Sequence, residues 1–240
     1  MGETLVLLHG FAGTGRGWDP VIAELGRERY TALAPDLRGH GSQAGARPVS
    51  FEAITADVLA GAPARFALGG YSMGGRIALG VALAAPERIS RLVLVATTAG
   101  IEDADERAER RAADERLADA IEREDIEAFA GRWLTQQLFA GDDEAAQQLA
   151  RADIARNRPA GLAAALRGVG TGAMAPLWTR LGELRMPVLV LAGERDVRFT
   201  AIGRRLAAAI PGAQLEVIAG AGHALPRAAP AAIARAISAR

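Results

Sequence analysis

Short runs of apolar residues recur along the chain, and segments of helical pattern separate most of them. Each run lies shortly before Gly, Asp or Ser, which is typical of strands buried in a parallel sheet. The runs span residues 4–8, 30–34, 66–70, 92–96, 188–192 and 215–218. This alternation predicts an α/β fold with a mainly parallel sheet of about six strands that carries helices on both faces.

Helix starts are marked by residues that cap a helix N-terminus. Asp19 followed by Pro20 predicts a helix that runs toward Leu25, because Pro is favoured at the first helical position. Ser50 similarly opens a predicted helix over 51–60, and an Ala- and Leu-rich helix over 77–85 follows the third apolar run.

Between Gly100 and about Leu184 the strand pattern is absent. This stretch predicts helices over 103–122, 125–139, 142–156 and 161–168, with a short one near 176–181. Inserted between two strands of a parallel sheet, such a segment is expected to cover the carboxyl ends of the strands, where ligands bind. We therefore expect a core of residues 1–100 and 185–240 and a helical cap of residues 101–184. A separate helical domain is the alternative, which the return of the sheet at Pro187 disfavours.

The composition excludes several classes of function. The 240 residues are 50% hydrophobic, and 28 basic residues balance 28 acidic ones, so no net field attracts nucleic acid or an anionic membrane. The sequence holds no lysine and no cysteine, which removes Schiff-base chemistry, thiolate nucleophiles and Cys-ligated zinc. No apolar run is long enough for a signal or membrane-spanning segment. We expect a cytoplasmic protein, assumed to be a monomer, that acts on a small molecule.

The stretch around Ser72 has the order that a nucleophile elbow requires. An apolar run ends in Gly70-Tyr71-Ser72-Met73-Gly74, and a helical segment follows at once. The tight strand–turn–helix junction leaves no room for bulk two positions before or after the serine. Its backbone lies at a helix N-terminus, which favours a developing oxyanion.

A nucleophilic serine needs a base and an acid that orients the base. Of the three histidines, His223 follows the last apolar run and is expected at the same sheet edge as Ser72, whereas His9 and His40 lie in other loops. The candidate acid is Asp196, after the fifth run, with Glu194 as its rival. The order Ser, Asp, His is the one that α/β-hydrolases use.

An oxyanion hole needs two N–H donors. The residue after the serine, Met73, is one candidate, and Phe11 in the loop after the first run is the other. The Phe11 side chain could equally serve core packing, because the proposed role uses only the backbone.

The Gly-rich stretch 10–17 offers two other interpretations. A phosphate loop would need a lysine and a Ser or Thr where Arg16 and Gly17 stand. In a dinucleotide-binding fold Asp36 would bind the ribose. Such a fold needs a small residue at the position of Trp18, so that helix and strand can pack closely. With no His-Glu-x-x-His and no clustered ligands, we expect no metal.

Two arginines fall where charge is costly. Arg110 shares a helical stripe with Ala113, Leu117 and Ile121, and Arg76 stands one turn beyond Ser72. Either an acid such as Glu106 neutralises Arg110, or Arg110 awaits an anionic ligand. Paired guanidinium groups near a nucleophile would suit a substrate with carboxylates.

These motifs resemble the α/β-hydrolase superfamily over the full chain. The chain is most similar to the 2-succinyl-6-hydroxy-2,4-cyclohexadiene-1-carboxylate synthases (SHCHC synthases) of menaquinone biosynthesis. The matching pieces are residues 8–11, 70–76, 106–110, 166–172 and 193–196 with Phe199. The usual N-terminal antiparallel strands would be missing or short, since three residues precede the first run.

The resemblance implies a lyase without a cofactor that removes a proton from a tricarboxylate cyclohexene and expels pyruvate. By motif position, Ser72, His223 and Asp196 would be catalytic, with Phe11 and Met73 as the oxyanion hole. The pocket would be lined by Tyr71 and Trp133, and carboxylates would bind Arg76 and Arg110. A further arginine of the family has no clean match: Arg151, Arg156 and Arg167 are candidates, and the ungapped position holds Ile154.

Two other functions share this scaffold. A carboxylesterase or C–C bond hydrolase would use the same serine to form an acyl-enzyme. A non-enzymatic ligand receptor is the third class, which a complete triad disfavours.

Overall fold

The computed structural model describes residues 2–26 and 28–239. Within these residues a sheet of six strands has the order β2-β1-β3-β4-β5-β6, and each neighbouring pair is parallel. The strands are β1 Glu3–Leu8, β2 Tyr30–Leu33, β3 Phe66–Tyr71, β4 Ile89–Val95, β5 Val188–Gly193 and β6 Gln214–Ile218. The predicted α/β fold class is confirmed, and every strand lies on one of the predicted apolar runs.

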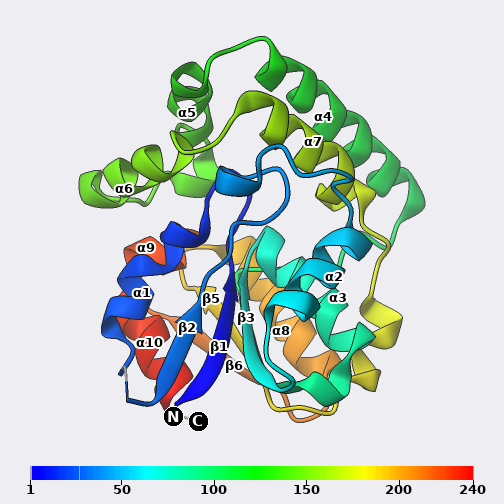
Figure 1. Ribbon diagram of the computed structural model, residues 1–240, viewed down its shortest axis with the longest axis vertical. Coiled ribbons are helices and arrows are strands. Elements are labelled where there is room, and N and C mark those ends of the chain that lie inside the picture. Colours follow the sequence, from blue (N-terminus) through cyan, green and yellow to red (C-terminus); the bar gives the residue numbers. More distant parts are fainter. Residues whose placement is uncertain (1, 27, 240) are drawn as a thin grey trace.

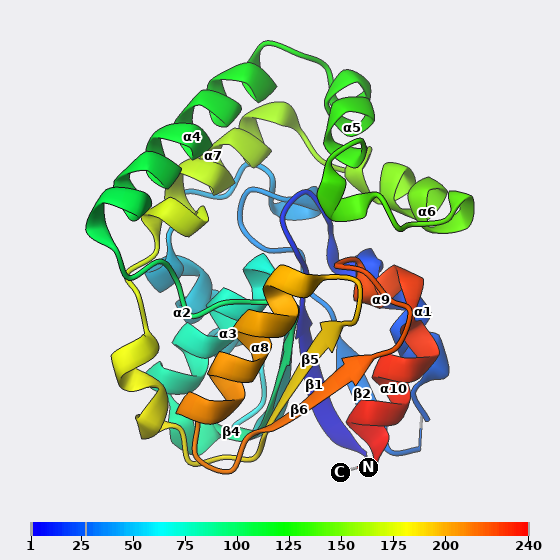
Figure 2. The same ribbon diagram turned by 180° about the vertical axis from the view of Figure 1, so that it is seen from behind.

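Helices cover both faces of the sheet, as Figures 1 and 2 show. One face carries α2 (Phe51–Gly61), α3 (Met73–Ala84) and α8 (Val197–Ala209), and the other carries α1 (Asp19–Glu24), the short α9 (Leu225–Ala228) and α10 (Pro230–Ser238). The N-cap prediction at Ser50 holds, because its Oγ accepts a hydrogen bond from the Ala53 N–H at 3.2 Å.

The pleat of β1 explains why both faces are apolar. Val6 and Leu8 belong to the cluster packed under α2, α3 and α8, whereas Leu5 and Leu7 belong to the cluster that includes Val21 and Ile237. Successive side chains of a strand point to opposite faces, so a strand buried on both sides must be apolar throughout.

The chain between β4 and β5 is helical, as predicted. It contains α4 (Ala104–Glu122), α5 (Ile126–Leu134), α6 (Glu144–Ile154) and α7 (Pro159–Val169), followed by the 3₁₀ segment η6 (Trp178–Glu183). Helices α4 to α7 lie above the carboxyl ends of the strands in Figure 1. An apolar cluster holds these helices together with residues such as Ile121, Phe129 and Leu162, and it also includes Ala12 and Ala224 of the loops below. We call residues 101–184 the helical segment.

No helix among residues 2–26 and 28–239 combines the length and the apolar character that a membrane crossing would need.

Candidate active site

Ser72 occupies a strained turn between β3 and α3. Its φ of +51° lies in the left-handed region, which residues with a side chain rarely adopt. Glycines permit this geometry: a Cβ on Gly70 would lie 2.3 Å from the carbonyl oxygen of Gly74, and one on Gly74 would lie 2.2 Å from that of Leu8. The turn aims Ser72 over the carboxyl edge of the sheet.

His223 connects Ser72 to Asp196. Its Nδ1 lies 2.6 Å from Asp196 Oδ2, and its Nε2 lies 3.3 Å from Ser72 Oγ. A carboxylate only accepts hydrogen bonds, so Nδ1 carries the proton of the neutral ring and Nε2 is left to accept from the serine hydroxyl. His223 and Asp196 are buried at 2% and 8% exposure, so water competes little for these bonds.

Asp196 is fixed by its own helix. Its Oδ1 accepts from the Phe199 N–H at 3.1 Å and thereby caps α8, while Oδ2 faces the histidine. The Phe199 ring packs 4.5 Å from the His223 ring. The rival acid Glu194 instead accepts from the Gly220 N–H at 2.8 Å, in an exposed loop.

The other two histidines lie elsewhere. His9 and His40 are buried, and their rings pack in a T-shaped contact with centroids 4.9 Å apart. Burial lowers the pKa of both, that of His40 to about 3. His9 Nε2 accepts from the Leu37 N–H at 3.0 Å, and His40 Nε2 accepts from the Ala12 N–H at 3.3 Å. Both rings are therefore neutral acceptors that support loops beside the site.

A cavity of about 750 Å³ lies between Ser72 and the helical segment. Its wall includes Ser72, His223 and the two predicted oxyanion residues, Phe11 and Met73. Met73 is the first residue of α3, where backbone N–H groups lack partners within the helix. The four residues come from three segments at the sheet edge: the loop after β1, the junction of β3 and α3, and the loop after β6.

Arg76 lines this cavity from α3. Its side chain is buried, and Nη1 has no hydrogen-bond partner within the described chain. Burial, together with the nearby Arg110, lowers the pKa of Arg76 to about 10, although Asp114 opposes this. A buried cationic donor without a partner is costly unless a ligand supplies an acceptor.

Arg110 lines the same cavity from α4, together with Ala113 and Leu117 of its stripe. Its Nε donates to Asp114 Oδ1 at 2.8 Å, so the neutralising acid is Asp114 rather than Glu106. Asp114 is buried and also accepts from the Gly172 N–H at 3.2 Å. Arg110 is thus both paired and open to the cavity, since 41% of its side chain is exposed.

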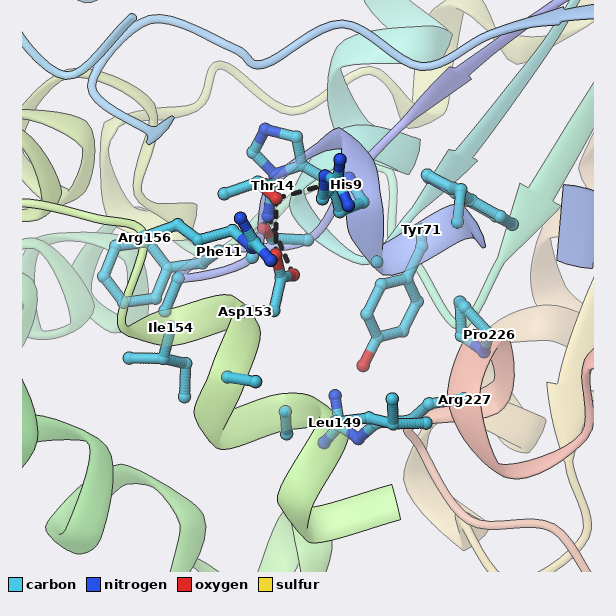
Figure 3. A pocket seen from close by; sticks show the side chains of 18 of the residues that line it. His9, Phe11, Thr14, Tyr71, Leu149, Asp153, Ile154, Arg156, Pro226 and Arg227 are labelled. Atoms are coloured by element: carbon cyan, nitrogen blue, oxygen red, sulfur yellow. Dashed lines mark hydrogen bonds between the residues drawn. The ribbon is translucent and has the colours of Figure 1, made fainter. Parts of the chain in front are cut away.

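Trp133 and Phe11 separate this cavity from a neighbouring one of about 310 Å³, and both residues line both cavities. Their rings pack 5.2 Å apart. Tyr71 lines the neighbouring cavity and points into it in Figure 3, although its ring lies only 5.4 Å from that of His223. The structure therefore places Tyr71 behind the triad, on the other side of the aromatic wall.

None of the three candidate arginines of the helical segment lines the cavity of Ser72. Arg156 and Ile154 line the neighbouring cavity instead (Figure 3). Arg167 is held by Glu115, Asp119 and Glu122, and Arg151 lies 4.0 Å from Glu127.

Arg198 and Arg205 of α8 line the cavity of Ser72. Arg205 is paired with Glu102 at 2.6 Å and stacks on the Trp178 ring at 3.8 Å. Neither arginine was predicted from the sequence. The signal for Arg198 was its place two residues after Asp196, at the same sheet edge.

No group of three or more His, Cys, Asp or Glu side chains within residues 2–26 and 28–239 is arranged to hold a metal ion.

The comparison with known families agrees with this geometry. Residues 5–236 match the model of the "Alpha/beta hydrolase family". The chain belongs to this family. A relative from Bacillus subtilis (strain 168) is 37% identical over 92% of this chain and 84% of its own length. A 2-succinyl-6-hydroxy-2,4-cyclohexadiene-1-carboxylate synthase of Salmonella arizonae is 34% identical over 95% of this chain and 90% of its own.

A solved structure shares the fold closely. MenH from S. aureus has a TM-score of 0.91 at 32% identity, over 99% of this chain and 92% of its own.

Proposed function

We propose that this member of the alpha/beta hydrolase family is a cofactor-free lyase of the SHCHC synthase type, which eliminates pyruvate from a carboxylate-rich cyclohexene. Ser72, His223 and Asp196 carry the proton transfers, and Phe11 and Met73 supply the oxyanion hole. The similarity to the Salmonella arizonae 2-succinyl-6-hydroxy-2,4-cyclohexadiene-1-carboxylate synthase supports this reaction. The cytoplasmic location expected from the sequence remains a prediction.

The observation that carries the proposal is the buried Arg76 beside Ser72. A neutral ester brings no anion that could pair with a buried guanidinium whose Nη1 lacks a partner within the described chain. A carboxylate satisfies such a group, because the guanidinium fork binds its two oxygens in parallel. The cavity also offers Arg110 and Arg198, so a substrate with several carboxylates finds a cation for each.

The triad performs the elimination as a proton relay. Ser72 Oγ gives its proton to His223 Nε2, and the resulting alkoxide removes a proton from a carbon of the ring. The freed electron pair forms the new double bond and breaks the C–O bond to the pyruvate unit. The imidazolium then returns its proton to the leaving oxygen, and the enol becomes pyruvate. Asp196 stabilises the imidazolium throughout.

The N–H groups of Phe11 and Met73 act on the charge that develops next to the removed proton. Negative charge on a carbonyl or carboxylate oxygen of the substrate is stabilised by donors that are already in place. The N-terminus of α3 adds the positive end of its dipole at the same point.

We further propose that residues 101–184 act as a cap and that residues 1–100 and 185–240 form the catalytic core. The helical segment supplies Arg110 and Trp133 to the cavity, and the core supplies Ser72, His223 and Arg76. Trp133 separates the substrate from the neighbouring cavity, into which Tyr71 points (Figure 3).

A carboxylesterase is the second candidate. A thermophilic esterase from Thermogutta terrifontis, whose structure has malate bound, has a TM-score of 0.87 at 27% identity, over 100% of this chain and 89% of its own. In this alternative the Ser72 alkoxide attacks an ester carbonyl and forms an acyl-enzyme.

Two assays on the purified protein separate these candidates. We expect release of pyruvate from the enolpyruvyl cyclohexene precursor of SHCHC, and little turnover of p-nitrophenyl acetate. Fast hydrolysis of the ester without release of pyruvate would support the esterase and refute the lyase.

A further inference from the structure

The loop after β1 contains a strained residue next to the proposed oxyanion donor Phe11. Ala12 has a φ of +62°, in the left-handed region that alanine disfavours. The Gly13 N–H donates to the Gly10 carbonyl at 3.2 Å, which closes a turn with Phe11 and Ala12 at its centre. A strained backbone of this kind persists only where its surroundings hold it.

Two buried side chains hold the Ala12 backbone from opposite ends. The Ala12 N–H donates to His40 Nε2 at 3.3 Å, and the Ala12 carbonyl accepts from Asn157 Nδ2 at 2.9 Å. His40 and Asn157 are 0% and 5% exposed, so water does not replace either bond. The two peptide groups on either side of the Ala12 Cα are thereby fixed in orientation.

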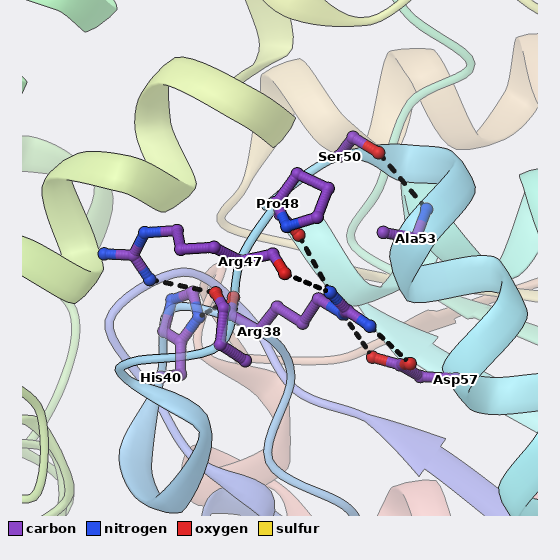
Figure 4. Close-up of polar contacts among 8 residues, drawn as sticks. Arg38, His40, Arg47, Pro48, Ser50, Ala53 and Asp57 are labelled. Atoms are coloured by element: carbon purple, nitrogen blue, oxygen red, sulfur yellow. Dashed lines mark hydrogen bonds and ion pairs between the residues drawn. The ribbon is translucent and has the colours of Figure 1, made fainter.

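Asn157 lies in the turn between α6 and α7 and completes a three-way contact. Its Oδ1 accepts from the Gly41 N–H at 2.9 Å, while its Nδ2 reaches Ala12. The loop that carries His40 and Gly41 is itself braced by Arg38, which binds Asp57 and the carbonyl oxygens of Arg47 and Pro48 (Figure 4). The loop whose Gly41 N–H binds Asn157 is therefore itself held in place.

A second connection joins the same loop to α6. Thr14 donates through both its N–H and its hydroxyl to Asp153, as the dashed lines in Figure 3 show. This contact lies two residues beyond Ala12, on the side away from Phe11. It supplies a matched reference, because it also ties the loop after β1 to the helical segment without touching the Ala12 peptide groups.

We propose that Asn157 is a positioning residue for the oxyanion hole. It holds the Ala12 carbonyl and so fixes the turn that directs the Phe11 N–H at the developing oxyanion. The placement of the helical segment over the core is thereby linked to the assembly of the hole. This inference rests on the proposed function, in which Phe11 is one of the two donors.

The role predicts a specific kinetic signature. Stabilisation of an oxyanion acts in the transition state, so a displaced donor lowers kcat and leaves KM nearly unchanged. The loss of one donor from an oxyanion hole costs about 10²–10³-fold in kcat, and a displaced one costs less. A purely structural role of Asn157 would instead lower the melting temperature with kcat per folded molecule intact.

The test compares Asn157→Asp with Thr14→Val. The aspartate keeps an acceptor for the Gly41 N–H but places an oxygen against the Ala12 carbonyl. Thr14→Val removes the two bonds of the hydroxyl, to Asp153 and from the Arg16 N–H, and leaves the bonds of the Ala12 peptide groups in place. We expect kcat for pyruvate release to fall about 10–100-fold in Asn157→Asp with KM within about twofold, and to stay within about twofold in Thr14→Val. If Asn157→Asp does not fold, Asn157→Ala removes the amide without adding a charge, and the same loss is expected.

The rate at which a fluorophosphonate labels Ser72 separates this inference from the proposed function, because that reaction needs the oxyanion hole but not the natural substrate. We expect labelling to slow about tenfold or more in the Asn157 variant alone. Unchanged labelling and kcat in a folded Asn157 variant, or equal losses in Thr14→Val, would overturn the positioning role. Wild-type protein that is labelled but releases no pyruvate would refute the proposed substrate, and the labelling rates would still decide the role of Asn157.

Discussion

The backbone N–H of Arg76 donates to the carbonyl of Ser72 at 3.2 Å, so one turn of α3 ties the two residues together. The same turn brings the buried guanidinium to the cavity that Ser72 lines. A serine and a cation on one helical turn keep a fixed spacing, which suits the proposed substrate with a carboxylate near its reacting carbon.

Arg76→Met is expected to separate activity from stability. Methionine removes a buried charge whose Nη1 has no partner, so the free energy of unfolding should rise by about 1–2 kcal/mol. The fall in kcat/KM should correspond to a loss of about 2–3 kcal/mol of transition-state stabilisation, because a charge-assisted bond to the substrate is lost. Urea unfolding and steady-state kinetics measure the two effects. A variant that is less stable and fully active would contradict this role of Arg76.

Arg110→Ala should lower kcat/KM by an amount that corresponds to about 2–3 kcal/mol of transition-state stabilisation, because a second carboxylate contact is lost. Arg116→Ala is the matched control, because Arg116 is exposed on the same helix and does not line the cavity. Kinetics of both variants with the enolpyruvyl substrate give the comparison. Equal kcat/KM in the two variants would remove Arg110 from the site.

Asp196→Asn should reduce kcat by about 10⁴-fold, because the amide favours the wrong histidine tautomer while it preserves the shape of the site. Glu194→Gln should leave kcat within about twofold, since the Glu194 carboxylate accepts from the Gly220 N–H and does not line the cavity of Ser72. The pair of variants decides between the two acids that the sequence offered. A large loss in Glu194→Gln with an active Asp196→Asn would reverse the assignment.

The buried His40 makes stability depend on pH. Its pKa is about 3 in the folded protein and 6.5 in its ordinary state, chiefly because of burial and secondly because of His9. The unfolded chain therefore binds the proton first, and stability falls as the pH drops from 6.5 toward 3, by up to about 1.4 kcal/mol per pH unit. The free energy of unfolding, measured with urea at several pH values, should depend less steeply on pH in His40→Gln than in the wild type. An equal pH dependence of stability in the two proteins would contradict the role given to His40.

The sequence predicts much of this fold because few arrangements satisfy its pattern. Apolar runs without alternation require a sheet covered on both faces, and parallel strands bring their carboxyl ends to one edge. Ser72, Asp196 and His223 each follow such a strand, so their approach could be predicted without coordinates.

Other features depend on side-chain geometry that no spacing encodes. The stripe of Arg110 predicted that it faces inward, but the choice of Asp114 over Glu106 depends on which carboxylate is buried beside Gly172. The left-handed backbone of Ala12 arises from bonds to His40 and Asn157, which lie 28 and 145 residues away. Such long-range contacts become visible only when the loops are placed in space.

The most direct test of the account is whether Ser72 and His223 act as one unit in pyruvate release. We predict that Ser72→Ala and His223→Ala each lose at least about 10³-fold in kcat and that the double variant loses little more, because either change alone breaks the relay. A lactate dehydrogenase-coupled assay measures all three variants. Losses that multiply in the double variant, or an active His223→Ala, would contradict the relay.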